Sequence, residues 1–429
     1  MMEPKAPALP LPATLNARLS VMMFLQYAIW GAWLPLFWSF LTEYRKLSPE
    51  QAGLLFSIAA IGAIVAPFIA GQVADRLMNT EKFLAISHIL GAVLVWQLAN
   101  VTTFQGFVLF GLLYSMIYAP TLPLTNSLAF HHLPDRDRDF GKVRVWGTVG
   151  WICVGIGIGQ WLLHRHTPQG EAAVVRTAQV MGMADAFKLS AILGVLQGLY
   201  CLSLPATPPK PGQQKFAPLA ALGEVKKMPL LVLFLIAFPI ACMHQFYFVH
   251  TAGFLGTLKN DVADNINVLF GVGGGGLMTI GQMGEILVLA LMPVMAKRMS
   301  RKTLLTIGLC AYVARFAVFA FSSSPILVIP ALALHGLVFG CFFFVCFMIV
   351  DENTKPDVRA SAQGLFNLVI VGLGTIVGNL FSGWIGGQAK PEGAAVTNWK
   401  LLFGLPLAVC AVCLVALLVL YPSKKTEAA

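Results

Sequence analysis

Charged residues are scarce in this sequence. Asp, Glu, Lys and Arg together make up 11% of its 429 residues, whereas soluble domains carry about 25%. No segment is polar and long enough to form a soluble domain, which argues against a receptor. The eight histidines are scattered without ligand spacing, so the sequence gives no sign of a membrane enzyme built around a metal or a nucleophile.

Cysteine and glycine patterns exclude two further classes. The eight cysteines all fall within apolar runs, and the pair Cys410 and Cys413 has no second pair to complete a metal site. The run Gly271 to Gly276 is not followed by Lys-Ser/Thr, so it is not the phosphate-binding loop of an ATPase. We therefore expect no metal, no cofactor and no ATP-driven step.

Long apolar runs account for most of the chain. Hydrophobic residues make up 57% of it, and the mean hydropathy is +0.76. A membrane span needs about 20 apolar residues and must satisfy its own backbone hydrogen bonds, so the runs predict about twelve transmembrane helices. Their approximate bounds are 17–42, 50–74, 81–101, 104–131, 141–164, 185–204, 229–256, 268–297, 302–321, 325–350, 358–387 and 396–421.

Basic residues predict the orientation of these helices. The net charge is +10, and most of the 29 Lys and Arg fall in loops on the same side as the N-terminus. This positive-inside bias predicts that both termini are cytoplasmic, and it accounts for the charge without a nucleic-acid partner. The first apolar run is long enough to span and lacks a clear cleavage site, so we expect no signal peptide.

A polar segment divides the chain into two halves. Residues 205–227 are rich in Pro, Gln and Lys, which is typical of a linker. The turns after the second and eighth spans resemble each other weakly, as do those before the fifth and eleventh. We therefore expect a six-helix bundle over 1–204, a cytoplasmic linker over 205–228 and a second bundle over 229–429.

One carboxylate lies deep inside a predicted span. Glu285 and Gln282 are three residues apart in an apolar run, so they share one helical face. A carboxylate at bilayer depth costs about 2.5–3.5 kcal/mol on insertion scales. It is by default a proton carrier, an ion ligand or a contact for a polar substrate. The alternative is a structural salt bridge or hydrogen bond within the bundle.

Several short segments resemble one transporter family. The turn Gly71-Gln72-Val73-Ala74-Asp75-Arg76 resembles the signature turn of the major facilitator superfamily. The other segments are FLQYAIWGAWL (24–34), YAPTLPLTNSLAF (118–130), VRVWGTVGW (143–151), GQMGE (281–285), ARFAVFA (314–320) and RASAQGLF (359–366). Together they resemble the bacterial nucleoside–proton symporters of that superfamily, from about residue 17 to 420. The resemblance implies two six-helix bundles with a substrate site near the membrane midplane between them.

In the fifth span the resemblance implies three nucleoside contacts. Arg144, Thr148 and Trp151 are spaced i, i+4 and i+7, so they share one face. A guanidinium supplies hydrogen-bond donors, a hydroxyl supplies a donor and an acceptor, and an aromatic ring can stack on a base. The alternative is that Arg144 belongs to the cytoplasmic charge cluster of residues 135–142 and that Trp151 only packs.

In the seventh and eighth spans the resemblance implies further contacts. Gln245, Gln282 and Glu285 match substrate-binding positions of the family. Phe248 stands where the family has Asn, and it replaces an amide with an apolar ring. His244 and His250 are nearby polar groups that could substitute, although packing through hydrogen bonds is the alternative for each.

The tenth span departs from the family twice. Phe339 matches, but His335 replaces a Tyr and Gly340 replaces the Asp that the family associates with proton coupling. This leaves Glu285 as the candidate proton carrier. In the ninth span Arg315 is costly unless it is paired, so we expect a structural ion or carbonyl contact there.

These observations predict a secondary transporter that imports nucleosides by alternating access, with proton symport through Glu285. Asp75 and Arg76 are expected to lock the inner gate. The expected partners are a small-molecule substrate, protons and membrane lipid, with the protein acting as a monomer in a bacterial inner membrane. The alternative is a carrier for another hydroxylated solute, such as a sugar, without proton coupling.

Overall fold

The computed structural model describes residues 10–72, 78–208, 223–258, 261–355, 359–391, 394 and 396–422. Within these residues every regular element is helical, because a backbone in lipid must satisfy its hydrogen bonds internally. Twelve helical segments are long and apolar enough to cross a membrane. The prediction of an all-α polytopic membrane protein is therefore confirmed.

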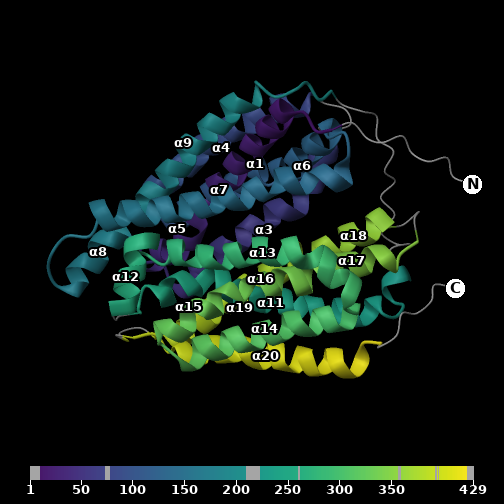
Figure 1. Cartoon of the computed structure of the whole chain (residues 1–429). Helices are drawn as coiled ribbons and strands as arrows, with labels where there is room; N and C mark the ends of the chain where they lie inside the picture. The colour runs from purple at the N-terminus through teal and green to yellow at the C-terminus, as the bar shows by residue number, and fades with distance from the viewer. Residues whose placement is uncertain are drawn as a thin grey trace, which may run out of the picture. The chain divides into compact units, whose positions relative to one another are not determined.

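Apart from the stretch between α9 (Ala184–Cys201) and α11 (Leu230–Leu255), the helices follow one another with short connections (Figure 1). The first six spans are built from α1 (Ala13–Trp33) with η1 (Leu34–Leu36), α2 (Phe37–Ser39) and η2 (Phe40–Tyr44), α3 (Pro49–Gln72), α4 (Thr80–Asn100), α5 (Phe104–Tyr118) with α6 (Thr121–His132), α7 (Arg136–Arg165), and α8 (Ala172–Gly182) with α9 (Ala184–Cys201).

The later spans contain two stretches of wider π-helical turn, η4 and η5. These spans are built from α11 (Leu230–Leu255), α13 (Gly275–Arg298), α14 (Arg301–Phe321), α15 (Pro325–Ala333) with α16 (His335–Leu337), η4 (Val338–Phe344) and α17 (Val345–Glu352), α18 (Arg359–Asn367) with η5 (Leu368–Gly374) and α19 (Thr375–Ala389), and α20 (Trp399–Leu420).

The sixth span begins earlier than predicted. The apolar run suggested a start at residue 185, but α8 begins at Ala172 and leads into α9 after one residue. Arg176 lowers the hydropathy of this stretch, and its guanidinium is paired with Glu43 of η2 (Nη2 to Oε1, 2.5 Å). Pairing makes a charged residue acceptable on a helix that the sequence pattern alone assigned to a loop.

The eighth span is interrupted where it was predicted to be continuous. A separate helix, α12 (Asp261–Phe270), precedes α13, and the backbone between them turns through Gly271, Gly273 and Gly274 with φ of +75°, +88° and +83°. Side chains rarely adopt this left-handed conformation. A Cβ on Gly274 would also lie 2.2 Å from the carbonyl oxygen of Ala252. The glycine run is therefore a helix-breaking turn.

The chain divides into two compact units. The first comprises 1–33, 65–154 and 184–212, and the second comprises 34–64, 155–183 and 213–429. In the first unit α4 and α1 both pack against α9 (Figure 1). The expected bundles at 1–204 and 229–429 follow a different division, and most of the expected linker lies outside the described residues.

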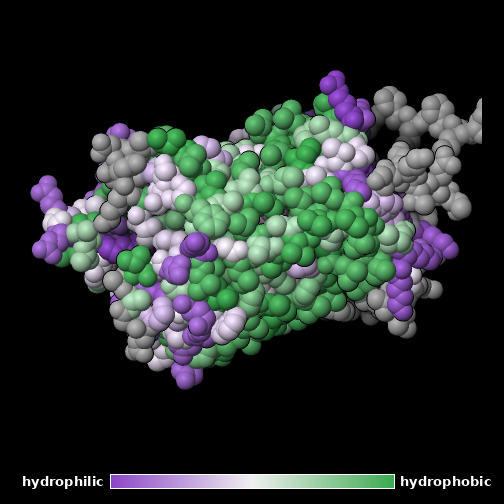
Figure 2. Space-filling model, turned by 90° about the horizontal axis from the view of Figure 1, so that it is seen from below, coloured by the Kyte–Doolittle hydropathy of each residue, from purple (hydrophilic) through white to green (hydrophobic). Residues whose placement is uncertain are grey.

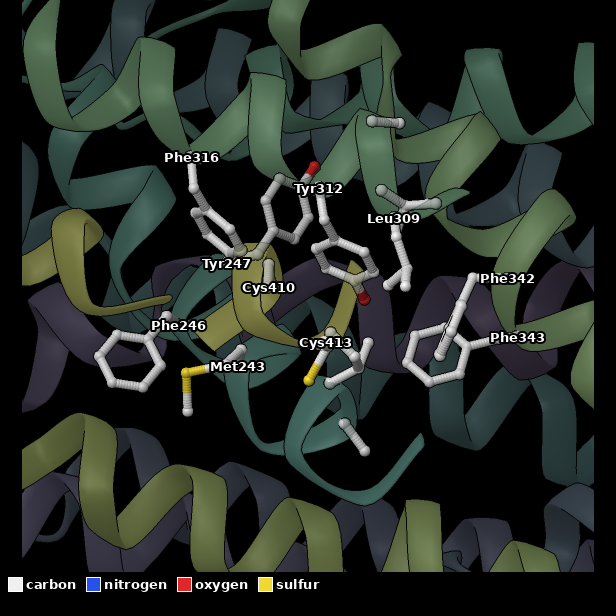
Figure 3. Packing of buried hydrophobic residues seen from close by; sticks show 14 of the residues in the cluster. Met243, Phe246, Tyr247, Leu309, Tyr312, Phe316, Phe342, Phe343, Cys410 and Cys413 are labelled. Atoms are coloured by element: carbon white, nitrogen blue, oxygen red, sulfur yellow. The ribbon is translucent and has the colours of Figure 1, made fainter. Parts of the chain in front are cut away.

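The second unit contains a large aromatic core. Tyr247 of α11, Tyr312 and Phe316 of α14, and Cys410 of α20 gather at one place within it (Figure 3). On the face that Figure 2 shows, hydrophobic surface is continuous in the middle and hydrophilic residues lie towards two opposite ends. Such a surface is suited to lipid rather than water.

The turn before α13 generates a first prediction. Gly274→Ala should lower folding stability by at least about 1 kcal/mol, because a left-handed alanine is strained and its Cβ would strike Ala252. The measurement is the melting temperature of the purified protein in detergent. Gly404→Ala in α20 is the matched control, since no described atom beyond the local helix backbone and the adjacent residues lies within 4 Å of a Cβ placed there. Equal melting temperatures for Gly274→Ala and wild type would contradict the geometry.

Candidate functional site

The predicted site residues form one group in each unit. Arg144, Thr148 and Trp151 lie on α7 in the first unit. The second group is drawn from α11, α13, α16 and η4 of the second unit, and it comprises Gln245, Phe248, Gln282, Glu285, His335 and Phe339. The gating residues Asp75 and Arg76 lie outside the described residues.

In the first unit Arg144 stands apart from the charge cluster at the start of α7. Its guanidinium carbon lies 4.0 Å from the centre of the Tyr27 ring of α1, which is a cation–π contact. The buried Asp139 carboxylate is instead paired with Arg138 at 2.6 Å and Lys142 at 2.9 Å. Among the described residues no hydrogen bond or ion pair engages the Arg144 guanidinium.

Trp151 is packed on one edge by a second tryptophan. Its ring lies 6.2 Å from that of Trp30, edge to face, and Trp30 lies 6.3 Å from the Tyr118 ring. Trp151 is 9% exposed, while Thr148, one turn before it, is partly exposed. The fifth span thus presents a cation and a hydroxyl beside an aromatic wall.

In the second unit Gln282 and Glu285 lie one turn apart on α13, as predicted. Gln282 is buried, and its carbonyl oxygen Oε1 has no hydrogen-bond partner among the described residues. The Glu285 side chain is 14% exposed, and its Oε2 lies 4.0 Å from Nε2 of His335. An amide acceptor and a carboxyl group are therefore held side by side near an imidazole.

On α11 Gln245 and Phe248 are one turn apart, and both are partly exposed. The Gln245 amide makes only long contacts, of 3.4 Å to the carbonyl of Ala241 and 3.5 Å to the hydroxyl of Thr375. The Phe248 ring lies edge to face with His335 at 6.1 Å. The hydrogen bonds of the Gln245 amide to these groups are therefore weak. Phe248 places an apolar ring edge beside the His335 imidazole.

The two histidines of α11 have different surroundings. His244 accepts or donates a 2.7 Å hydrogen bond with the hydroxyl of Tyr312 and stacks on His335 at 5.5 Å. His250 is bonded instead to Ser382 of α19, with Nε2 2.9 Å from the hydroxyl. His244 belongs to the group around His335, whereas His250 joins two helices.

The partner of Arg315 differs from the one expected. Its Nη1 lies 3.1 Å from Nδ1 of His335, and its guanidinium carbon lies 4.3 Å from the ring centre of Tyr247. No ion pair to Arg315 occurs among the described residues. The expected ion or carbonyl contact is therefore replaced by an imidazole and by aromatic faces. The sequence signalled only that the charge needed a partner.

Gly340 stands at a close contact between α13 and the tenth span. A Cβ at this position would lie 2.6 Å from Cγ1 of Val288. One turn earlier, a Cβ on Gly336 would lie 2.1 Å from the carbonyl oxygen of Gly284. The place where the family has an Asp is thus filled by Val288, and backbone contact fixes Glu285 opposite His335.

Phe339 lies beside this contact, on the π-helical stretch η4. It is partly exposed, and its ring is 6.4 Å from that of Phe343.

Among the described residues no group of three His, Cys, Asp or Glu side chains is placed to hold a metal ion.

The chain resembles known transporters over most of its length. The model described as nucleoside H⁺ symporter matches residues 13–426. YegT of Escherichia coli is 29% identical over 96% of this chain and 95% of its own. The nucleoside permease NupG of the same species is 26% identical over 91% of each chain, and its xanthosine permease is 27% identical over 90% of this chain and 91% of its own.

Solved structures agree with these matches. A crystal structure of a variant of the nucleoside transporter NupG superposes with a TM-score of 0.83 at 25% identity, covering 95% of this chain and all of the other. A D-xylose–proton symporter superposes with a TM-score of 0.70 at 14% identity, covering 97% of this chain and all of the other, which shows the fold alone. The predicted major facilitator fold is confirmed, and the matched proteins are transporters, not enzymes.

The Gly340 contact generates a second prediction. Gly340→Asp should destabilise the protein by about 1–3 kcal/mol, because the new side chain overlaps Val288. Val288→Ala combined with Gly340→Asp should recover part of the loss, since it removes the obstructing methyl groups. Melting temperatures of both variants, with Val288→Ala alone as the control, test this. A Gly340→Asp protein as stable as wild type would show that the contact is not tight.

Proposed function

The chain belongs to the nucleoside H⁺ symporter family, and we propose that the residues described above supply both parts of this activity, nucleoside binding and proton transfer. It is a secondary transporter with twelve membrane-spanning helices. The relatives NupG and xanthosine permease are named for nucleosides, which supports a nucleoside as the solute here. Transport by alternating access follows from the fold.

The observation that carries the binding proposal is the pair on α13. Gln282 Oε1 is buried with no hydrogen-bond partner in the part of the chain that the structure describes, and an unsatisfied buried acceptor costs about 1–3 kcal/mol. A ribose hydroxyl or a base N–H would satisfy it, with Glu285 one turn away as a second contact. Phe248 and Phe339 supply apolar surface of the kind that ligand sites place beside a few polar groups.

The first unit carries a separate group of polar and aromatic side chains that we also assign to the nucleoside. The Arg144 guanidinium keeps N–H donors while it lies over Tyr27, and Thr148 adds a hydroxyl on the same face of α7. Trp151 offers an aromatic edge next to Trp30. We assign Arg144 and Thr148 to hydrogen bonds with the nucleoside, and Trp151 to contact with the base.

Glu285 is the group to which we assign the proton. It is partly exposed on a membrane-spanning helix and faces His335, so it can exchange a proton with water and respond to a change in its surroundings. Binding of nucleoside and of proton must favour each other for symport to occur. Each charge moved through 100 mV supplies about 2.3 kcal/mol for accumulation.

The remaining assignments concern architecture and location. We assign six-helix bundles to 1–204 and 229–429, a cytoplasmic linker to 205–228, and cytoplasmic termini on the basis of the basic loops. The bacterial relatives support an inner-membrane location. Asp75 and Arg76 are assigned to the inner gate, and the protein is assigned a monomeric state.

Uptake into proteoliposomes tests the proposal. With an inward gradient of one pH unit, the wild-type protein should accumulate labelled uridine or adenosine by up to about tenfold, the limit for one proton per nucleoside. Glu285→Gln should lose this gradient-driven accumulation and keep part of its nucleoside exchange, because an amide can still hydrogen-bond but cannot carry the proton.

A matched carboxylate serves as the control for this experiment. Glu224→Gln should behave as wild type, since Glu224 lies beyond the spans in a pair with Lys227 of the kind that contributes little. Full gradient-driven accumulation by Glu285→Gln would remove Glu285 from the coupling role. If no nucleoside shifts the melting temperature while a sugar does, the substrate assignment is wrong.

One observation favours a second candidate, an uncoupled carrier for nucleosides or another hydroxylated solute. The position at which the family has its coupling Asp is Gly340, and Val288 fills the space. A carrier without coupling would equilibrate its solute and show no dependence of accumulation on the pH gradient. The same uptake experiment separates the two candidates.

A further inference from the structure

We propose that Arg315, acting through His335, is the fixed positive charge that controls when Glu285 gives up its proton. Arg315 is thus a positioning residue for coupling, in a chain where Gly340 stands at the position of the family's coupling Asp. The inference rests on the proposed role of Glu285 as proton carrier.

Arg315 carries a full charge in the interior of the second unit. The residue is fully buried on α14, and arginine does not deprotonate in proteins. The ring centres of Tyr247, Tyr312 and Phe316 lie 4.3, 5.2 and 5.2 Å from its guanidinium carbon. All three residues are labelled in Figure 3. Nε and Nη2 have no hydrogen-bond partner among the described residues. Its charge is therefore only partly compensated by its direct contacts.

The contact with His335 fixes the state of the imidazole. A guanidinium nitrogen can only donate, so Nδ1 of His335, 3.1 Å from Nη1, must accept. The neutral ring then carries its single proton on Nε2, the atom that faces Glu285 Oε2 at 4.0 Å. Protonation of Nδ1 would set two donors against each other. His335 therefore stays neutral while this contact lasts, and the proton that moves belongs to Glu285.

The line from Arg315 through His335 to Glu285 joins α14, α16 and α13. Ionised Glu285 faces an N–H donor with a cation behind it, which favours the carboxylate over the acid. The Gly284 and Gly336 backbones hold α13 and α16 together at this point, so the 4.0 Å gap depends on their packing. A proton from outer water adds to the Glu285 carboxylate and leaves as the same proton to inner water, with no other bond made or broken.

Other titratable groups of the second unit also pack along this line. His244 stacks on His335 at 5.5 Å and is bonded to Tyr312, and Tyr247 stacks on His335 at 4.7 Å. The packed helices α20 and η4 bring the thiols Cys410 and Cys341, and α15 brings no titratable side chain. The side chains of Asp261 and Asp264 on α12 lie outside the described part of the chain. Arg315 is the one permanent charge in this described group.

Infrared difference spectroscopy tests the proposal on the full-length protein without nucleoside. The stretching band of the protonated carboxyl, identified by its loss in Glu285→Gln, is followed against pH. In Arg315→Met the midpoint should move to higher pH by at least about one unit, because loss of the cation destabilises the carboxylate. Arg315→Lys keeps the charge and should stay within about half a unit of wild type.

The His335 variants test the link itself. His335→Gln retains one acceptor and one donor, so the Glu285 midpoint should stay near the wild-type value. His335→Phe has neither, so the Glu285 midpoint should move to higher pH, as in Arg315→Met. Arg176→Met is the control, because it removes a partly exposed arginine that is paired with Glu43, and its midpoint should not change.

Two results would overturn the inference. The first is an Arg315→Met midpoint equal to that of wild type, and the second is an Arg315→Lys midpoint that moves as far as that of Arg315→Met, which would indicate packing instead of charge. If Arg315→Met fails to fold, the comparison of His335→Gln with His335→Phe tests the inference instead. Equal Glu285 midpoints in these two variants would refute the role of His335 between Arg315 and Glu285. The titration is carried out without nucleoside, so it does not depend on the substrate. If the Arg315→Met midpoint shifts but the wild-type protein transports no nucleoside, the proposed function is refuted and this inference is not.

Discussion

The buried charge of Arg315 constrains the side chains that surround it in the second unit. A guanidinium cannot shed its proton inside the protein, so its neighbours must accept its donors or offer aromatic faces. Tyr247, Tyr312 and Phe316 supply the faces, and His335 supplies the acceptor. The orientation of His335 follows from that bond, and it directs the remaining ring nitrogen at Glu285.

Helix packing brings the other members of the site to this line. The close backbone contact at Gly284 and Gly336 sets α13 against α16, and such contacts between small residues are a general means of joining helices in membranes. The pair Gln282 and Glu285 is thereby held beside the aromatic surface of α11. In the function that we propose, nucleoside recognition and proton exchange depend on this same helix contact.

The sequence predicted the class of protein and the positions of most spans, because hydropathy and the cost of unpaired backbone in lipid act locally. It also placed Gln282 and Glu285 on one face, since i, i+3 spacing is a property of the helix itself. It did not predict α8, because an arginine whose charge is paired with Glu43 lowers the apolar signal without preventing a helix. It assigned Gly271 to Gly274 to one continuous span, because hydropathy does not report backbone dihedrals.

Two contacts of the site join helices that are distant in sequence. Arg315 is bonded to His335, and Val288 fills the space beside Gly340. No local pattern reports them.

The number of protons that accompany each nucleoside tests the account most directly. Uridine uptake into proteoliposomes would be measured together with the internal pH, reported by an entrapped dye, with the membrane potential held at zero. The account predicts that one proton enters with each nucleoside, since Glu285 is the single carrier assigned. Nucleoside accumulation with no proton entry would contradict it.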